Sequence, residues 1–354
     1  MERRPAGSDA PARPVTLRQA RYAGTLRPVL RVLALAGATA LGGCREEPGG
    51  PPPASADATL ESRVGARLDS LQARTSLYAR HLPTGREIAI RADEPMNTLS
   101  VIKLPVMVLA FRDAEAGRLD LDARRTVGPD DLRRGSGLLQ TFAPGLEPTL
   151  RDLVTQMIVT SDNTATDMLI REVGLDRVNA WLTEAGYAET RLNRTTGDLF
   201  REVWIRADPA NASLTDREVF DRGFPRDSLA SPRSFVLEGD STRWLGRTTA
   251  REIARLLEDI QGDRLSTPEH ATEMMEILEG QFYETRLPRF LGSRARVAHK
   301  TGDWPPIAGN DVGILLYPGG PTVVAIFTNQ NTGDFTALEE TLGRIALDLV
   351  EAWR

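Results

Sequence analysis

The alternation of apolar and polar residues divides the chain, from about residue 58 onward, into strands near both ends and helices between them. Two short runs with strand character, 77–81 and 87–91, flank the turn Pro83-Thr84-Gly85, which predicts a hairpin. Apolar positions recur at helical spacing through the middle of the chain. We expect helices at 60–73, 104–111, 149–159, 164–173, 176–185, 248–260, 268–278 and 335–353, and strands at 296–300, 311–317 and 322–328.

This order of elements predicts the fold class. Strands at both ends around a helical middle indicate an α+β domain built in three layers, α/β/α. Residues 58–354 have ordinary apolar content and are numerous enough for one large domain or a domain with two lobes. Between about 200 and 246 the pattern is interrupted by polar and aromatic residues in turn. We treat this stretch as an insertion, which either reshapes a cleft or forms a surface loop far from any chemistry.

Two segments precede this domain. Residues 1–44 have the organisation of a lipoprotein signal peptide, because Arg27 and Arg31 precede an apolar stretch, 32–41, that leads through Leu-Gly-Gly to Cys44. The apolar stretch is shorter than the roughly 20 residues needed to span a bilayer. Residues 45–57 are rich in Pro, Gly and Ala and indicate a tether.

Cys44 is the only cysteine in the chain, so it has no partner for an internal disulfide or for a metal site. We predict that it is the lipidation site, the alternative being an incidental buried cysteine. The prediction implies a lipid-anchored protein of the bacterial cell envelope that faces the periplasm. Residues 1–26 are long for the start of a signal peptide, so a start downstream of Met1 stays an open alternative.

Composition excludes some classes of partner. The formal charge of −5 and a pI near 5.5 provide no basic field for nucleic acid. The sequence has no repeat with the period of a solenoid and no glycine-rich phosphate loop. We therefore expect no nucleic acid partner, no cofactor and no metal, and we expect a monomer.

Three short motifs carry the candidate chemistry: Ser100-Val101-Ile102-Lys103, Ser161-Asp162-Asn163 and Lys300-Thr301-Gly302. Each alone has an ordinary explanation, since the first can be a capping serine followed by a solvated lysine and the second is a good helix N-cap. Together they supply a nucleophile, a proton relay and an anion clamp. If a helix begins near Ser100, as Pro105 in a first turn would allow, Lys103 shares its face and its amine can reach the hydroxyl.

With these motifs and their flanks, residues 59–354 resemble the class A β-lactamases, which belong to the superfamily of β-lactamases and penicillin-binding proteins. The resemblance implies an antiparallel sheet flanked by helices, with an all-helical lobe beside it and the active site between the two. It also implies the catalytic residues. Ser100 would be the nucleophile, Lys103 its base with a pKa lowered by burial beside Lys300, and Ser161 the donor of a proton to the leaving nitrogen.

The same resemblance implies how a substrate is held. Asn163 would bind a substrate amide, and Lys300 with Thr301 would bind the carboxylate that substrates of this superfamily carry. Gly302 would let the substrate lie close to the strand, and the backbone N–H groups of Ser100 and Asp303 would form the oxyanion hole. For His299 two interpretations stay open: a strand residue that flanks the site, or a general base.

One part of the family pattern is missing. Class A β-lactamases carry a glutamate after the second motif that activates the water for deacylation, and the stretch 190–200 places Thr196 at that position. A threonine cannot act as a general base at neutral pH, and such a base contributes roughly 10²–10⁴ in rate. Deacylation is therefore expected to be slow, unless Asp198 or Glu202 reaches the water from a shifted loop.

We predict a serine hydrolase of the class A β-lactamase type, which opens β-lactams through an acyl-serine and so confers antibiotic resistance. The alternative is a penicillin-binding DD-peptidase-like enzyme that acts on peptidoglycan stem peptides, which the missing glutamate favours. A non-catalytic cell-wall binding module is the third hypothesis. The intact Ser100, Lys103, Ser161 and Lys300 argue against it, because a decayed site should have lost at least one of them.

Overall fold

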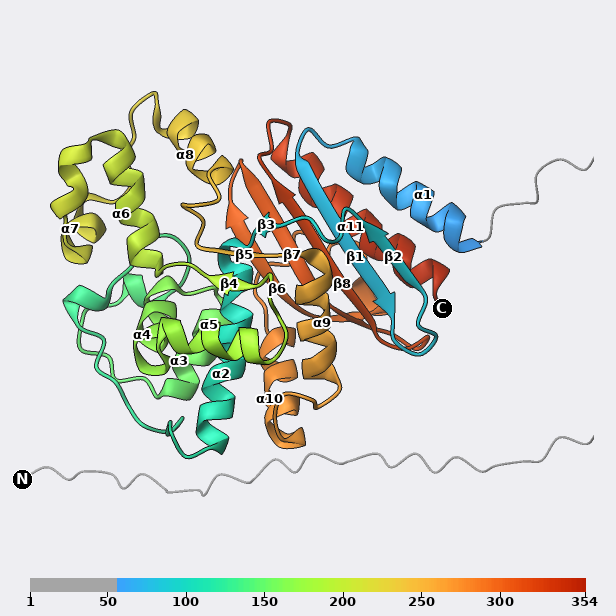
Figure 1. Cartoon of the computed structure of the whole chain (residues 1–354), viewed down its shortest axis with the longest axis horizontal. Helices are drawn as coiled ribbons and strands as arrows, with labels where there is room; N and C mark the ends of the chain where they lie inside the picture. The colour runs from blue at the N-terminus through green and yellow to red at the C-terminus, as the bar shows by residue number, and fades with distance from the viewer. Residues whose placement is uncertain (1–55) are drawn as a thin grey trace, which may run out of the picture. The chain divides into compact units, whose positions relative to one another are not determined.

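The computed structural model describes residues 56–354, and within them five strands form one antiparallel sheet in the order β2-β1-β8-β7-β6 (Figure 1). The predicted hairpin is present as β1 (Arg74–His81) and β2 (Glu87–Ile90), with Leu77 opposite Ile90. The C-terminal part of the chain supplies the other three strands: β6 (Arg296–Trp304), β7 (Ala308–Leu316) and β8 (Thr322–Asn329).

One face of this sheet is covered by the first and last helices of the described chain, α1 (Ala56–Asp69) and α11 (Phe335–Ala352) (Figure 1). Leu60, Val64 and Leu68 of α1 are buried and belong to one apolar cluster with Leu342 of α11 and with inward residues of the strands. The two ends of the domain are therefore held together through a shared apolar core.

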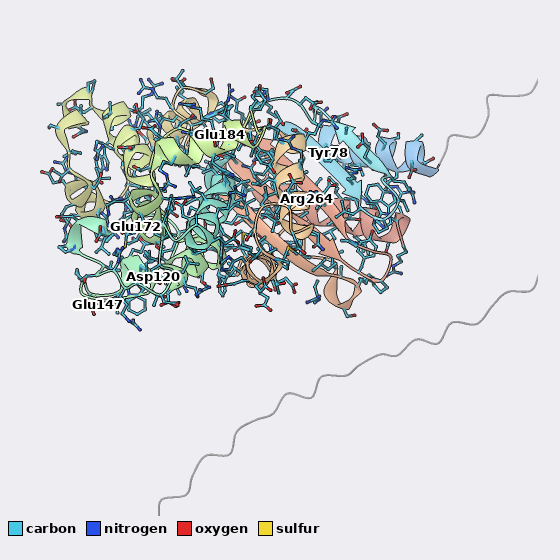
Figure 2. All side chains as sticks on the ribbon, turned by 60° about the horizontal axis from the view of Figure 1, so that its bottom comes forward. Tyr78, Asp120, Glu147, Glu172, Glu184 and Arg264 are labelled. Atoms are coloured by element: carbon cyan, nitrogen blue, oxygen red, sulfur yellow. The ribbon has the colours of Figure 1, made fainter. Side chains whose placement is uncertain are left out.

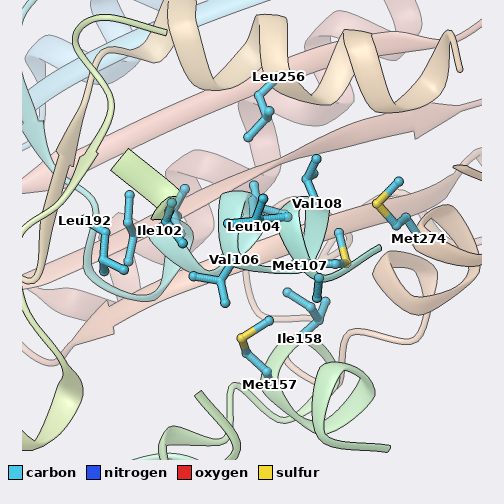
Figure 3. Close-up of a cluster of buried hydrophobic side chains, with 14 of the residues drawn as sticks. Ile102, Leu104, Val106, Met107, Val108, Met157, Ile158, Leu192, Leu256 and Met274 are labelled. Carbon is cyan, nitrogen blue, oxygen red and sulfur yellow. The ribbon is translucent and has the colours of Figure 1, made fainter. Parts of the chain in front are cut away.

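The other face is covered by α9 (Ala250–Gln261) and α10 (Pro268–Glu279), and beyond it lies the helical lobe. The lobe contains α2 (Lys103–Glu115), α3 (Leu150–Val159), α4 (Asn163–Val173) and α5 (Leu175–Glu184). Figure 3 shows α2 at the centre of the larger apolar cluster, with Met157 and Ile158 of α3 on one side and Leu256 of α9 on the other. Because α2 is buried on nearly all sides, it is the axis to which both halves of the domain attach.

A small second sheet joins the two halves. It has the order β3-β5-β4, from β3 (Met96–Asn97), β5 (Gly246–Thr248) and β4 (Arg191–Leu192). β3 leads directly into the first motif, so this sheet fixes the approach of the chain to Ser100. Figure 2 shows the same division from another side, with Tyr78 and Arg264 in the half that contains the large sheet and Asp120, Glu147 and Glu172 in the helical half.

The stretch near 200–246, which the sequence analysis treats as an insertion, is helical. It contains α6 (Thr196–Ala207), α7 (Asp216–Arg222) and α8 (Ala230–Gly239), with a short 3₁₀ turn, η4 (Pro209–Ser213), between the first two. Phe200, Leu214 and Val219 form its own small apolar cluster. The insertion is thus a folded subdomain, and because α6 begins at Thr196 it is continuous with the expected deacylation loop.

Residues 56–354 contain four further 3₁₀ turns: η1 (Leu99–Ile102), η2 (Pro129–Asp131), η3 (Leu139–Thr141) and η5 (Gly292–Arg294). Among the helices of this part of the chain, none combines the length and the apolar character that crossing a bilayer requires. Cys44, the predicted lipidation site, lies outside the described residues.

Candidate active site

Ser100 lies on η1, directly before α2 begins at Lys103. The residue ahead of it, Leu99, has a φ of 46°, in the left-handed region that non-glycine residues rarely adopt. Ser100 is partly exposed and lines a cavity of about 290 Å³. The α-helix therefore starts three residues later than the motif suggested, and Pro105 lies in its first turn as expected.

Lys103 is fully buried, and its amine is turned toward the second motif. Nζ donates to the backbone oxygen of Ser161 at 2.6 Å, to Asn163 Oδ1 at 2.8 Å and to Ser161 Oγ at 3.2 Å. These bonds take the place of the expected direct contact between the Lys103 amine and the Ser100 hydroxyl. Burial, followed by the charge of Lys300, lowers the pKa of Lys103 well below its ordinary value, which gives the amine access to its neutral form.

The second motif closes a tight turn before α4. Ser161 has a φ of 55°, and Asp162 caps α4 by accepting from the backbone N–H of Ala165 at 2.9 Å. The same carboxylate accepts from Leu139 N at 2.7 Å. Asp162 therefore orients backbone, which agrees with its N-cap position. Burial raises the pKa of Asp162.

Lys300 reaches the same serine hydroxyl. Its Nζ donates to Ser161 Oγ at 3.0 Å and to the backbone oxygen of Thr301 at 2.8 Å. Burial lowers the pKa of Lys300 to about 7, against the opposing charges of Asp303 and Asp311. Because Ser161 Oγ accepts from both amines, its own hydrogen is free to be donated elsewhere.

The third motif is less exposed than the resemblance implied. Thr301 is fully buried, and its hydroxyl has no hydrogen-bond partner among the described residues. A Cβ on Gly302 would lie 2.5 Å from the backbone oxygen of Thr98. Glycine is thus required here so that β6 can pack against the chain just before Ser100, which is a different close approach from the expected one with substrate.

Asp303, the residue directly after the third motif, lines the cavity, whereas the three residues of the motif do not. Its carboxylate is paired with the guanidinium of Arg286, a buried residue that also donates to the backbone oxygen of Asn310 at 2.8 Å. Arg286 could not be identified from the sequence, because no short-range spacing links it to the third motif. His299 is buried and shares a 2.9 Å contact with Asp311, so it is a strand residue beside the site.

Ser136 is a further site residue that the sequence analysis missed. It lies on the loop before η3, lines the cavity, and donates through Oγ to the backbone oxygen of Ser161 at 2.8 Å. Asn163 is tied to the same loop, since its Nδ2 donates to the backbone oxygen of Arg134 at 2.9 Å. The only signal in the sequence is the pair of glycines on either side of Ser136.

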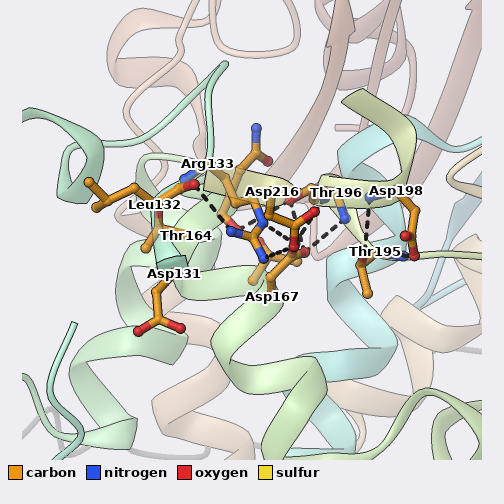
Figure 4. Close-up of polar contacts among 12 residues, drawn as sticks. Asp131, Leu132, Arg133, Thr164, Asp167, Thr195, Thr196, Asp198 and Asp216 are labelled. Atoms are coloured by element: carbon orange, nitrogen blue, oxygen red, sulfur yellow. Dashed lines mark hydrogen bonds and ion pairs between the residues drawn. The ribbon is translucent and has the colours of Figure 1, made fainter. Parts of the chain in front are cut away.

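Thr196 lines the cavity but is bound into a closed polar network (Figure 4). Asp167 accepts from both the backbone N–H and the hydroxyl of Thr196, each at 2.8 Å, and from Gly197 N at 2.9 Å. Asp167 also accepts from Arg133 Nε at 2.7 Å, and Arg133 continues to Asp216 at 2.6 Å. Both carboxylate oxygens of Asp167 are used in this network, so Asp167 is an anchor for the turn at Thr196.

The two carboxylates considered as substitute bases are also occupied. Asp198 accepts from the Thr195 hydroxyl at 2.8 Å and from Arg201 at 2.9 Å, while Glu202 is paired with Arg243 at 2.8 Å. Neither lines the cavity around Ser100. A shifted loop that brings one of them to the site is therefore not observed.

Comparison with known proteins places this geometry in a family. Residues 59–353 match the model of the β-lactamase enzyme family. The chain belongs to this family. A β-lactamase from Streptomyces fradiae is 28% identical over 310 residues, covering 85% of this chain and 89% of the relative. A protein from Streptomyces cacaoi named as a β-lactamase regulatory protein is 24% identical over 269 residues, covering 72% of this chain and 84% of the relative.

Solved structures agree. The crystal structure of a β-lactamase from Sphaerobacter thermophilus superposes with a TM-score of 0.66 at 26% identity, covering 82% of this chain and 96% of that one. A mutant of PBP-A, solved as an acyl-enzyme complex with penicillin G, has the same fold, with a TM-score of 0.66 at 23% identity over 83% of this chain and 96% of that one. The expected fold class and the assignment to β-lactamase-like serine hydrolases are confirmed.

Proposed function

We propose that this family member opens the β-lactam amide by forming an acyl-enzyme on Ser100, and that release of the acyl group is slow. The observation that carries the proposal is the position of the Ser161 hydroxyl. It lies between two fully buried lysine amines, at 3.2 Å from Lys103 and 3.0 Å from Lys300, behind the part of the cavity wall that Ser136 lines. A hydroxyl that accepts from both amines has its proton available for a leaving group.

In the acylation step, the neutral Lys103 amine gives up one of its bonds to the second motif, turns to Ser100 and takes its proton while Ser100 Oγ attacks the lactam carbonyl carbon. The Lys103 amine and the Ser161 hydroxyl are hydrogen-bonded, so Ser161 can relay the proton from Lys103 to the lactam nitrogen. The backbone N–H groups of Ser100 and Asp303 stabilise the oxyanion. The C–N bond then breaks, the nitrogen receives a proton from Ser161, and the product is an ester on Ser100.

Hydrolysis of that ester needs a base that activates water. Among the described residues that line the cavity, Asp303 is the one carboxylate, and it is paired with Arg286. Thr196 cannot take the proton. We therefore infer that the acyl-enzyme persists much longer than in an enzyme with a glutamate at this position.

The second candidate is a penicillin-binding, DD-peptidase-like enzyme that acts on peptidoglycan stem peptides. The observation that favours it is the Asp167 network, which fills the region where a deacylating base would stand with hydrogen bonds between protein groups. A non-catalytic binding module is disfavoured, because two buried lysines that converge on one serine have an electrostatic cost that a plain binding surface does not require.

One experiment separates these functions: intact-mass spectrometry with a chromogenic cephalosporin, following the adduct and the released product together. A slow hydrolase gives an adduct that decays with product formation. A penicillin-binding peptidase gives a lasting adduct and releases D-alanine from a stem-peptide substrate. A binding module gives no adduct, which would contradict the proposal.

We also propose that the mature protein is a monomer held to the bacterial envelope membrane, facing the periplasm, by lipid on Cys44. The Leu-Gly-Gly sequence ahead of this lone cysteine supports the proposal. Cys44→Ala should shift the protein from the membrane to the soluble fraction, since stable anchoring depends on buried acyl chains. A variant that stays with the membrane would rule out the lipid anchor.

A further inference from the structure

A second cavity, of about 380 Å³, lies against the small sheet and is walled by arginines. Three strands each contribute one of them: Arg74 of β1, Arg191 of β4 and Arg247 of β5. The rest of the wall comes from two loops and from the end of the insertion: Pro95, Asn193, Gly239, Ser241 and Trp244. Among the described residues no carboxylate lines this cavity, although the whole chain has a formal charge of −5. The positive character of this cavity, which we call the arginine pocket, is therefore a local feature and not a consequence of composition.

Two of these arginines face each other across a strand pair. Arg191 lies directly opposite Arg247 in the antiparallel pairing of β4 with β5. Side chains in such positions have Cβ atoms about 4.5–5.5 Å apart, and like charges there destabilise the pairing. The only other residue pair between these two strands is Leu192 with Gly246, so half of the pairing carries this repulsion.

Nearby carboxylates offset the positive charge only in part. Arg74 is 3.4 Å from Glu94, and Arg247 is 3.3 Å from Glu189. These four side chains are between 34% and 51% exposed, where water keeps an ion pair weak. Arg191 forms no ion pair among residues 56–354, and Arg247 Nε is buried there without a hydrogen-bond partner. The pocket therefore offers a positive charge and a buried N–H donor that the described part of the protein does not satisfy.

The wall opposite the arginines is held in place by hydrogen bonds. Trp244 is buried, and its indole N–H donates to the backbone oxygen of Glu238. Asn193 Nδ2 donates to the backbone oxygen of Trp244 at 3.3 Å, which joins this wall to the segment after β4. The carboxyl group of Glu238 accepts from Gln330 N at 2.9 Å, and burial raises its pKa to about 7, so it is only partly ionised at neutral pH. A ligand would thus enter a recess that is already formed, which lowers the entropic cost of binding.

We propose that the arginine pocket binds a phosphate-bearing anion, at a site separate from the catalytic cavity. Guanidinium groups present paired N–H donors that match the oxygens of a phosphate, and three of them can contact one phosphate from different sides. A phosphate carries up to two negative charges near neutral pH. It therefore offsets the free charge of Arg191 and the repulsion between Arg191 and Arg247 better than a single carboxylate does. The inference goes beyond the proposed hydrolysis of β-lactams and does not depend on it.

The test measures thermal unfolding of the full-length protein in rising concentrations of sodium phosphate, with sodium chloride added to hold the ionic strength constant. A ligand that binds only the folded state raises the melting temperature as its concentration rises. We expect a saturable rise of at least ~2 °C. Sodium acetate at the same ionic strength is the comparison for a singly charged anion and should give a smaller rise. Isothermal titration calorimetry with phosphate then gives the Kd.

Substitutions of the paired arginines locate the site. Arg191→Gln and Arg247→Gln should each weaken phosphate binding by at least ~10-fold, because each removes a charged donor. Arg191→Gln should also raise the melting temperature in the absence of phosphate, since it removes the repulsion opposite Arg247. Arg217→Gln is the matched control: it removes one positive charge from an exposed ion pair with Asp221 on α7 and should leave phosphate binding unchanged.

The phosphate can belong to a soluble compound or to the headgroup of a lipid, and vesicles distinguish these two sources. Cosedimentation of the Cys44→Ala protein with phosphatidylglycerol vesicles, lost when Arg191→Gln is added, would identify a lipid headgroup. Binding of free phosphate without cosedimentation would identify a soluble phosphate compound.

Three results would overturn the proposal. The first is a wild-type melting temperature that is the same in phosphate and in chloride. The second is a phosphate-dependent rise that both arginine variants keep, as expected if phosphate binds elsewhere or acts only by its exclusion from the protein surface. The third is a lower melting temperature of Arg191→Gln without phosphate, which would mean that Arg191 already has a stabilising partner. Failure of the proposed function looks different, since β-lactams would then form no adduct while phosphate binding is unaffected.

Discussion

Two buried polar groupings beside the cavity differ in whether they leave a hydrogen-bonding group available for a substrate. In the first, Lys103 and Lys300 direct their amines to the single hydroxyl of Ser161, and a hydrogen on that hydroxyl remains to be donated. In the second, Asp167 directs both of its oxygens to Thr196, Gly197 and Arg133, and no oxygen is left over. The lysine grouping can move protons, whereas the Asp167 network only holds its own backbone.

The difference indicates that burial alone does not make a group reactive. The lysines are costly to bury with their charge, so their pKa values fall and their protons become mobile. The Asp167 carboxylate is also buried but is satisfied by four hydrogen bonds, one of them from a guanidinium. Acylation and deacylation therefore depend on independent structures, and each can be altered without the other.

The largest effect is expected from removing the nucleophile. Ser100→Ala should reduce labelling by a penicillin by at least ~10³-fold, because Ser100 is the hydroxyl that lines the cavity at the start of the lysine-bearing helix. Intact-mass spectrometry followed by peptide mapping measures it, with the surface variant Ser70→Ala as the control. Label found on Ser161, or undiminished labelling of Ser100→Ala, would refute the claim that the lysine grouping serves the acylation of Ser100.

A base installed in the Asp167 network should speed deacylation. Thr196→Glu alone would place a carboxylate beside Asp167, and the repulsion should keep its gain small. In the double variant Thr196→Glu/Asp167→Asn the gain should be larger, up to ~10²-fold, which is within the range for general-base assistance. The decay of the adduct is followed by mass, and the rate of its formation should stay nearly constant.

Thr196→Gln is the matched control for this variant, because it has the size of glutamate without the base. If the glutamine variant deacylates as fast as the glutamate variants, the gain comes from disturbing the network and not from a base. If no variant at Thr196 alters deacylation, the equivalence of this position to the family's glutamate is wrong.

The pH dependence of acylation should distinguish the two lysines. The rate should fall toward acid pH as Lys103 is protonated, at a pH well below the ordinary pKa of lysine. With a β-lactam that carries a free carboxylate, the acylation rate should fall again above about pH 7, where Lys300 loses its charge. The fall should be up to ~10-fold per pH unit. Lys300→Gln should abolish this second decline. The methyl ester of the same β-lactam, which has no free carboxylate, should not show the decline either. A decline with the ester as well would assign it to another group.

The smallest effect is expected at the two carboxylates of α6. Asp198→Ala and Glu202→Ala should change the deacylation rate less than about twofold, since neither side chain lines the cavity and a base must reach the proton it removes. Single-turnover decay of the adduct, measured on folded protein, is the readout. An adduct that accumulates in either variant would mean that α6 moves to bring a base into the site.

Much of the fold follows from local patterns. The helices predicted at 149–159 and 164–173 are α3 and α4 to within one residue, because apolar spacing and the caps Thr149 and Asp162 coincide there. The prediction ends β6 at Lys300, but the strand continues to Trp304, since Gly302 and Asp303 disfavour a strand and are held in it by pairing with β7. The helices of the insertion are missed, although Thr215 with Glu218 forms a recognisable capping box.

The site divides in the same way. The family resemblance that the three short motifs carry implies that Lys103, Ser161 and Lys300 meet in one site, and the structure brings both amines to the Ser161 hydroxyl. The pairing of Asp303 with Arg286 joins a strand to the segment after α10, and no local spacing encodes it. The expected bond from the Lys103 amine to the Ser100 hydroxyl is replaced by bonds to Ser161 and Asn163, groups that lie about 60 residues further along the chain and that no local spacing around Ser100 encodes.

The loop around Ser136 has a consequence for finding similar chains. A Cβ on Gly137 would overlap the carboxylate and the Cα of Asp162, and one on Gly135 would fall 2.7 Å from Asn163 Nδ2. Both glycines also have positive φ, at 92° and 108° for Gly135 and Gly137. Substitution of either glycine by another residue is therefore incompatible with the packing of this loop against the second motif. A Gly-Ser-Gly triplet whose serine precedes a Ser-Asp-Asn by 25 residues is a marker that genome surveys could use to collect proteins with this same cavity wall.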